Sequence, residues 1–182
     1  MMSVHEAIRG RRSIRRFTDQ EVTGEQLALI LEAARWAPSW GNSQCWEIVV
    51  VRDREIRKKL QETLTPRNPA GPAMDTAPLV LVLAAAMGKS GCYKGERVTQ
   101  FSEWFMFDLG LATQNICLTA HALGLGSVIV GAFAHDRVKE IVGLTPGCEA
   151  VTMIPVGHAA HCPSAPQRRE VAEFVHEERF PG

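Results

Sequence analysis

The most chemically distinctive feature of this sequence is a run of arginines near the start of the chain. Five arginines occupy eight successive positions, and a serine lies among them in the stretch RRSIR. A phosphate monoester carries close to two negative charges at neutral pH, and guanidinium groups bind it through paired, charge-assisted hydrogen bonds. In an extended segment, Arg11, Ser13 and Arg15 would project to one side and Arg12 to the other, so the cluster would spread along a ligand. A solvated or salt-bridged basic turn is the competing interpretation.

The charge of the whole chain favours a small anion as the partner of these arginines. The 182 residues include 20 Lys+Arg and 20 Asp+Glu, so the formal net charge is zero. Proteins that coat nucleic acids or anionic lipids usually carry a clear positive excess. Nucleic-acid binding therefore stays only as an alternative, which salt-sensitive binding without a small ligand would indicate.

Three further segments have patterns that could contact the same ligand. APSWGNSQCW at 37–46 offers compact hydrogen-bonding groups before a strand, and GLGSVIVGAF at 124–133 has glycines that allow close backbone approach. APQRREVAEFV at 165–175 places Arg168 and Arg169 where they could fold back onto an anion. Each segment also has an ordinary interpretation: a helix-to-strand loop, a turn without the dinucleotide-binding glycine spacing, and surface charge.

Metal and disulfide chemistry find little support in the sequence. The five cysteines are odd in number and widely spaced, which favours reduced thiols. His158, His161 and Cys162 are too few ligands for a closed zinc site, so no metal is expected. The N-terminus lacks an apolar signal segment, and the uncharged run at 76–88 is too short to span a bilayer, which predicts a cytoplasmic protein.

The elements that must position these segments mix helices and strands in a single domain over residues 1–182. Thr23 and Gln26 have the spacing of a capping box at the start of a helix, and Pro38 ends that helix. Helices are predicted at 3–9, 23–37, 53–64, 100–123 and 135–144, strands at 46–51, 79–86, 127–133 and 149–157, loops at 65–78 and 87–98, and a tail at 158–182. The segment 100–123 is apolar around most of its circumference, which indicates either a central core helix or cover by a second subunit.

Together, the four segments resemble the nitroreductase family of FMN-dependent oxidoreductases. RRSIRRF is similar to the family's opening motif, and APSWGNSQCW to its A-P-S-x-x-N-x-Q-P-W signature. Residues 108–127 resemble its long central helix, and IPVGHAA with QRREVAEFV its closing strand and basic tail. The similarity covers the chain except the loops 65–78 and 87–98. It implies an α+β fold, a three-layer sandwich with a central mixed, mainly antiparallel sheet and helices on both faces, in a homodimer with exchanged C-terminal segments.

The resemblance also implies residues that would hold the phosphate end of FMN at the subunit interface. Arg11 and Arg168 would meet the phosphate group. Arg12 and Ser13 would lie beside the ribityl chain and the phosphate. Arg15 would approach the pyrimidine edge of the flavin ring.

A second group of residues would contact the ring itself. Pro38, Ser39 and Asn42 would reach the flavin of the other subunit. The backbone around Val130 and Gly131 would face the isoalloxazine.

The implied reaction passes hydride from NADH or NADPH through flavin N5 to a nitroaromatic, quinone or enone by a ping-pong mechanism. Arg15 would stabilise the negative charge of the reduced ring, and no acid–base pair is expected. The alternatives are a specialised member of the family (a reductive dehalogenase or an FMN-consuming lower-ligand synthase) and a non-catalytic flavin-binding protein. The sequence departs from the family pattern at Cys45, which stands in place of proline, and at Trp40, which could narrow the substrate pocket.

Overall fold

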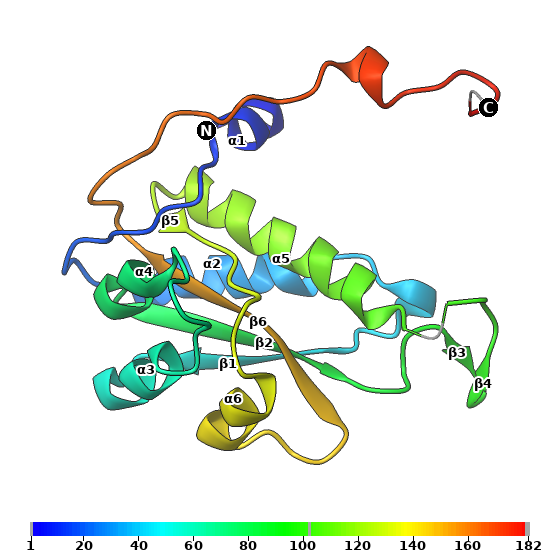
Figure 1. The fold of residues 1–182 in the computed structure, drawn as a ribbon, viewed down its shortest axis with the longest axis horizontal. Helices are drawn as coiled ribbons and strands as arrows, with labels where there is room; N and C mark the ends of the chain where they lie inside the picture. Colours follow the sequence, from blue (N-terminus) through cyan, green and yellow to red (C-terminus); the bar gives the residue numbers. More distant parts are fainter. Residues whose placement is uncertain (1, 102, 181–182) are drawn as a thin grey trace.

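A four-stranded sheet with helices on both faces organises the computed structural model, which describes residues 2–101 and 103–180 (Figure 1). Its strands are β1 (Trp46–Val51), β2 (Leu79–Ala86), β6 (Cys148–Gly157) and β5 (Gly126–Ser127), in the order β1-β2-β6-β5. All three neighbouring pairs are antiparallel. A separate hairpin pairs β3 (Cys92–Tyr93) with β4 (Glu96–Arg97). The predicted α+β class is confirmed.

The helices lie on two sides of this sheet. They are α1 (Val4–Gly10), α2 (Gly24–Arg35), α3 (Arg54–Gln61), α4 (Gly71–Thr76), α5 (Phe105–Ala122) and α6 (His135–Val142), with 3-10 turns η1 (Trp40–Asn42) and η2 (Val171–Glu173). All eight residues of β2 are buried, which explains their unbroken apolar run. Val80 and Val82 face a core shared with α3, α4 and α6, whereas Leu79 and Leu81 face a core shared with α2 and α5. Two apolar cores therefore separate three layers.

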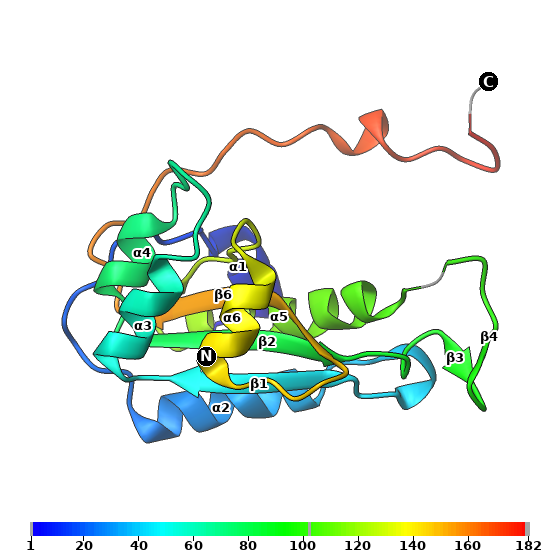
Figure 2. The ribbon, with the colours of Figure 1, turned by 60° about the horizontal axis from the view of Figure 1, so that its bottom comes forward.

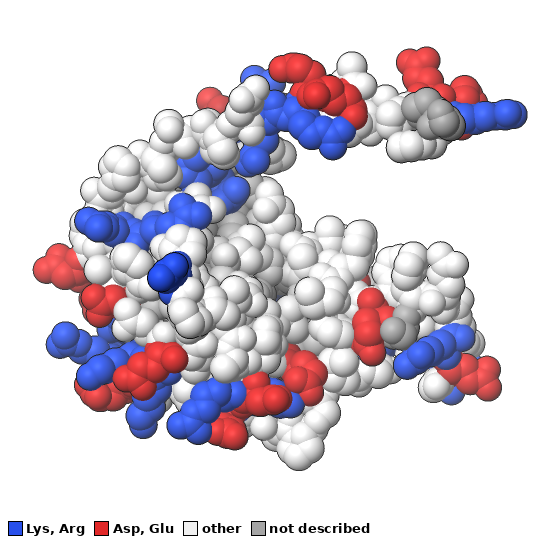
Figure 3. Space-filling model, in the orientation of Figure 1, with Lys and Arg blue, Asp and Glu red and all other residues white. Residues whose placement is uncertain are grey.

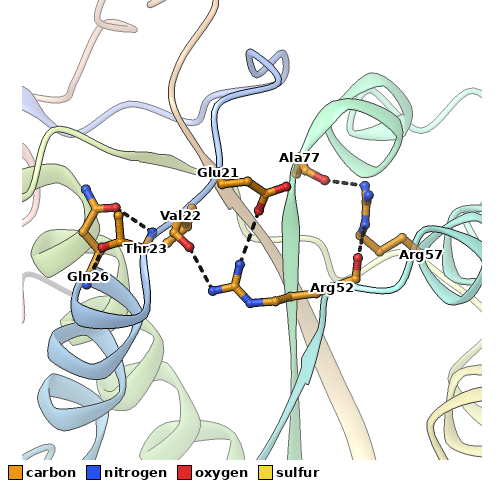
Figure 4. Close-up of polar contacts among 7 residues, drawn as sticks. All are labelled: Glu21, Val22, Thr23, Gln26, Arg52, Arg57 and Ala77. Atoms are coloured by element: carbon orange, nitrogen blue, oxygen red, sulfur yellow. Dashed lines mark hydrogen bonds and ion pairs between the residues drawn. The ribbon is translucent and has the colours of Figure 1, made fainter.

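The capping box predicted at the start of α2 is present. The Gln26 amide nitrogen donates to Thr23 Oγ1 over 3.1 Å, and the Thr23 amide donates back to Gln26 Oε1 over 3.0 Å (Figure 4). These two bonds satisfy backbone donors that the first helical turn leaves unpaired.

Two arginines after β1 serve the fold by binding backbone carbonyls. Arg52 donates to the Val22 carbonyl over 2.9 Å and lies 3.4 Å from a Glu21 carboxylate oxygen (Figure 4). Arg57 donates to the carbonyl of Ala77, at the entry to β2. Arg52 thus holds the chain before α2, and Arg57 holds the chain before β2, against the region where β1 leads into α3.

The arginine run lies in an extended segment between β5 and the chain that follows β6. Ser13 forms a parallel bridge with Ser127, and the Ile14 amide donates to the Ser127 carbonyl over 2.9 Å. The Thr18 amide donates to the His158 carbonyl over 2.9 Å. Ile14 and Phe17 are buried, so this segment is anchored by backbone hydrogen bonds and by two apolar side chains.

The prediction of a strand over 127–133 is wrong beyond its first residue. β5 ends at Ser127, and the following chain forms an isolated bridge with β6 between Val130 and Met153 in place of a continuous ladder. The Val128 amide donates weakly to the Pro155 carbonyl over 3.4 Å, but Pro155 has no amide hydrogen to donate in return. Proline at this register position therefore interrupts the ladder.

Three other predicted segments differ from the structure. The loop predicted at 65–78 contains α4, in whose first turn Pro72 is favourable because that position needs no amide donor. The helix predicted over 100–123 begins only at Phe105, and the loop predicted at 87–98 contains the β3–β4 hairpin. Ser102, in that predicted helix, and residues 181–182 of the predicted tail lie outside the described residues.

Helix α5 and the C-terminal tail leave large apolar side chains exposed. Leu109 and Ile116 are buried on one face of α5, whereas Met106 is 58% and Phe107 60% exposed. The tail runs away from the sheet in both ribbon views (Figure 2), and from Ser164 to residue 180 every side chain is exposed. Within the described part of the chain, no helix is long and apolar enough to cross a membrane.

Candidate functional site

The predicted phosphate-binding residues surround one cavity of about 250 Å³. It is lined by Arg11, Arg12, Ser13 and Arg15 from the N-terminal segment and by Pro163, Ser164, Pro166 and Arg168 from the tail. Figure 3 shows Lys and Arg side chains gathered at the upper left of the molecule, beside the base of the tail. The structure thus brings Arg168 to the arginine run, although more than 150 residues separate them in the sequence.

The hydrogen bonds of the arginine run leave it suited to an external anion. Arg12 Nη1 donates to the carbonyls of Arg9 and Arg11 over 2.6 and 2.9 Å, which directs this side chain along the backbone. Among the described residues, the ion pairs are formed by Arg35, Arg52, Arg137 and Lys139, and none involves an arginine of the run. The described residues therefore do not form the salt-bridged basic turn that was the competing interpretation of the arginine run.

A second cavity of about 260 Å³ adjoins the first, because Arg15 lines both. Its other lining residues are Thr65, Asn68, Pro69, Ala70 and the chain from Val128 to Ala132. Val130 exchanges backbone hydrogen bonds of 2.9 Å with Met153, and its carbonyl also accepts from Thr152 Oγ1 over 2.8 Å. This rigid stretch of backbone, with exposed Gly131 next to it, can support a planar ring.

Asn68 is a cavity residue that the sequence analysis missed. Its Nδ2 donates to the Ala132 carbonyl over 2.8 Å, and its Oδ1 accepts from the Ala70 amide over 2.9 Å. These bonds fix the loop before α4 against the backbone that lines the second cavity. Asn68 precedes a proline inside a breaker-rich loop, and that Asn-Pro turn signal could have marked it as ordered.

A third cavity of about 260 Å³ shares Arg11 and Arg12 with the first and is also lined by His121 and Ser127. Burial lowers the pKa of His121, and the positive charges of the two arginines lower it further. Ser127 Oγ is buried and has no hydrogen-bond partner among the described residues. Across residues 2–101 and 103–180, no group of three or more His, Cys, Asp or Glu side chains is placed to hold a metal ion.

Three of the residues predicted to contact the flavin ring lie near the start of α5, whereas the arginine run lies near its C-terminal end. Pro38, Ser39 and Asn42 occupy the turn around η1, and Ser39 Oγ accepts from the Gln44 amide over 3.0 Å. Asn42 has a φ of 56°, a left-handed conformation that asparagine tolerates better than most residues. Among the described residues, none of these three side chains lines a cavity that contains Arg15. A single chain therefore brings Val130 and Gly131 to Arg15, but not Pro38, Ser39 or Asn42.

A buried carboxylate that the sequence analysis did not single out holds this turn. Asp108 Oδ1 accepts from the Trp40 amide over 2.9 Å, and its Oδ2 accepts from Ser43 Oγ over 3.1 Å. The Cys45 thiol lies 3.6 Å from the same Oδ2 atom, and burial together with the charge of Asp108 raises the pKa of the thiol to about 11. Cys45 is therefore protonated and poorly reactive at neutral pH. A lone acidic residue in the otherwise apolar stretch 104–112 was the available signal for Asp108.

Comparison with known proteins identifies the family. The sequence model that describes the nitroreductase family matches residues 8–158. The chain belongs to this family. The match spans the arginine run, the turn around η1, the whole of α5 and the end of β6, so it includes both groups of predicted site residues except Arg168.

Individual members of the nitroreductase family are similar over most of their length. A Methanothermobacter thermautotrophicus protein, whose name places it with the NADH dehydrogenases and NAD(P)H nitroreductases, is 37% identical over 166 residues, covering 89% of this chain and 80% of its own. The FMN reductase [NAD(P)H] of Bacillus subtilis is 29% identical, covering 99% of this chain and 75% of its own. The NADPH:FMN oxidoreductase of Vibrio harveyi, solved in complex with NAD⁺, superposes with a TM-score of 0.83 at 28% identity, covering 98% and 78% of the two chains.

Proposed function

We propose that this chain is an FMN-dependent oxidoreductase, built as one domain over residues 1–182, that takes electrons from NADH or NADPH. The observation that carries the proposal is that Arg15 lines both an arginine-rich cavity and a backbone-lined cavity. FMN has the same two parts, a phosphate and a planar ring, joined by a short chain. The names of relatives support this cofactor, since they include an FMN reductase and an NADPH:FMN oxidoreductase.

The residues of the first cavity fit a phosphate monoester. Arg11, Arg12 and Arg168 supply positive charge and guanidinium donors, and Ser13 adds a hydroxyl. A phosphate monoester needs such donors because its oxygens accept hydrogen bonds on several sides.

The residues of the second cavity fit the flavin ring. The backbone at Val130 and Gly131 would support the ring, and Arg15, which lines both cavities, would lie between the phosphate and the ring. When bound, FMN supplies the hydride-transfer chemistry. Arg15 would supply the positive charge that stabilises the negative charge of the reduced ring.

The acceptor we propose is a nitroaromatic, a quinone or an enone, used in a ping-pong mechanism. Ile129 is 48% exposed and Gly131 is exposed beside the buried Val130, so a ligand on this surface stays open to solvent on one side. One face of the ring open to solvent would let donor and acceptor bind there in turn, as a ping-pong mechanism needs. A dehalogenase, an FMN-consuming lower-ligand synthase and a flavin-storage protein remain alternatives, which substrate profiling separates.

We further propose that the active unit is a homodimer in the cytoplasm. Pro38, Ser39 and Asn42 would then reach the flavin of the partner subunit. The apolar side chains exposed on α5 and on the tail, among them Phe107 at 60% and Phe180 at 80%, support burial against a second copy. All five cysteines are free, which suits a reducing compartment.

The test of the proposed function is anaerobic reduction of the FMN-loaded protein, followed by its visible absorption. We expect flavin bands that bleach with NADH or NADPH, and we expect Arg15→Gln to bleach at least about tenfold more slowly while retaining FMN. Arg16→Gln is the matched control, because Arg16 is exposed beside Arg15 and does not line either described cavity. Protein that takes up no FMN would refute the proposal, and equal rates for both variants would refute the role of Arg15.

A further inference from the structure

Asp108 is a fully buried carboxylate at the start of α5 that receives hydrogen bonds from two separate loops. From the loop after α2 it accepts the Trp40 amide at Oδ1 and the Ser43 hydroxyl at Oδ2. From the segment after β2 it accepts the Ser90 hydroxyl at Oδ2 over 2.7 Å. The Cys45 thiol is a fourth donor, at 3.6 Å from Oδ2. A buried carboxylate is tolerated only when it is satisfied in this way.

The two loops meet at this carboxylate. Figure 1 shows the turn around η1 and the segment that carries β3 and β4 at the same end of α5. Ser90 is itself 5% exposed, so its bond to Asp108 is shielded from water. Oδ2 is the atom that the loops share, because it accepts from Ser43 of one loop and from Ser90 of the other.

The second loop is held close to α5 by packing as well. Gly91 has a φ of 84°, and a Cβ at this position would lie 2.8 Å from Trp104 Cδ1. The Trp104 indole nitrogen donates to Thr99 Oγ1 over 2.7 Å. The hairpin between these anchors exposes Tyr93 at 63%, with Lys94 Nζ 5.5 Å from the centroid of its ring. An aromatic and cationic surface of this kind can contact a nicotinamide nucleotide or an aromatic acceptor.

We propose that Asp108 is a positioning residue that couples these two loops. Its carboxylate fixes the turn of Ser39 and Asn42, which faces the flavin of the partner subunit, and through Ser90 it fixes the hairpin that shapes the entry of the nucleotide and the acceptor. This role rests on the proposed function. Asparagine keeps one acceptor oxygen but replaces the other with an amide nitrogen that only donates, so it cannot accept from donors at both oxygen positions.

The first arm of the test is hydrogen–deuterium exchange on the flavin-free protein. In Asp108→Asn we expect faster exchange in residues 39–45 and in residues 88–98 together, by roughly tenfold or more. Ser90→Ala, which removes one donor, should also speed exchange in residues 39–45. Asp75→Asn, an exposed aspartate on α4, is the control and should change neither segment.

The second arm is kinetic and uses the FMN-loaded protein. Ser90→Ala should raise the KM for the acceptor by about tenfold while the Kd of FMN stays within about twofold. The hairpin loses its bond to Asp108, whereas the loosened turn of residues 39–45 keeps the bonds from Trp40 and Ser43. Ser43→Ala should instead raise the Kd of FMN. Adding Ser90→Ala to Asp108→Asn should produce no further rise in KM, because both changes remove the same bond.

The outcomes separate this inference from the proposed function. If exchange in Asp108→Asn rises in one loop only, or if the kinetic effects of the two changes multiply, the coupling role is overturned while an FMN-reducing parent keeps the proposed function. If the parent neither binds nor reduces FMN, the positioning role falls together with the function. If Asp108→Asn does not fold, the exchange of Ser90→Ala tests the coupling instead. Faster exchange in both 39–45 and 88–98 supports the coupling, and faster exchange in 88–98 alone overturns it.

Discussion

Arg168 offers the sharpest test of the phosphate cavity, because its neighbour in the sequence is a natural control. Arg168 lines the cavity together with Arg11, Arg12 and Ser13. Arg169 instead binds within the tail: its guanidinium donates to the Glu173 carbonyl and lies 5.6 Å from the centroid of the Phe174 ring. The variants Arg168→Ala and Arg169→Ala remove the same charge from adjacent positions. Only the first removes a donor from the cavity.

The expected size of the effect follows from the exposure of the site. A hydrogen bond to a charged group contributes about 1.5–3 kcal/mol, and Arg168 is exposed, so we expect about 1–2 kcal/mol after solvent screening. This loss corresponds to a Kd for FMN that is about 5- to 30-fold weaker in Arg168→Ala. Riboflavin has no phosphate, so its Kd should change by less than about twofold in the same variant.

The assay is titration of flavin fluorescence with FMN and with riboflavin at low and high ionic strength. The preference of the parent protein for FMN should shrink in Arg168→Ala and should depend on salt, because exposed charge pairs are screened. Arg169→Ala should bind both flavins as the parent does. Equal weakening of FMN and riboflavin, or equal effects of the two arginine variants, would refute the assignment of this cavity to a phosphate.

Two further predictions concern the packing beneath the arginine run and the buried thiol. In Gly126→Ala the new Cβ would lie 2.5 Å from Cγ1 of buried Ile14. We therefore expect the free energy of unfolding in urea to fall by about 1–3 kcal/mol and FMN to bind more weakly. Gly71→Ala is the control and should show neither effect, because a Cβ at Gly71 would have nothing within 4 Å. Burial raises the pKa of Cys45 from 9.0 to about 11, so its contribution to stability is full below pH 9 and is lost as the pH rises toward 11. The unfolding free energy of Cys45→Ala should therefore fall less steeply over that interval than that of the parent, by on the order of 2 kcal/mol in total, and parallel curves would contradict the assignment.

The sequence predicted the regular elements where local chemistry decides them. The Thr23 cap appears as expected, and so does the uninterrupted buried strand β2. The prediction of a strand over 127–133 is wrong because β6 presents Pro155 as its partner, and nothing within 127–133 indicates that. The short helix α4 was not predicted because Pro69, Gly71 and Pro72, at its start, are also typical of a loop.

In the candidate site, too, some features could be predicted from local sequence and others depended on contacts between distant segments. The composition of the arginine run indicated a small anion, and the order of the motifs indicated the family. That Arg168 lies across one cavity from Arg11 depends on the tail folding back over the N-terminal segment, a contact without any local signal. The role of Asp108 was equally invisible, since its four donors come from two stretches of chain, 40–45 and Ser90, that meet only at the start of α5.

The sequence by itself therefore determined the kind of chemistry: side-chain types decide which ligand groups can be bound, and short-range spacing decides where helices begin and strands run. Only the tertiary structure decided the geometry. It brought the tail to the arginine run, placed Arg15 between two cavities, and kept Ser39 and Asn42 away from both within one chain. Such contacts depend on how the layers pack around β2 and α5, and packing is a property of the whole chain that no single segment contains.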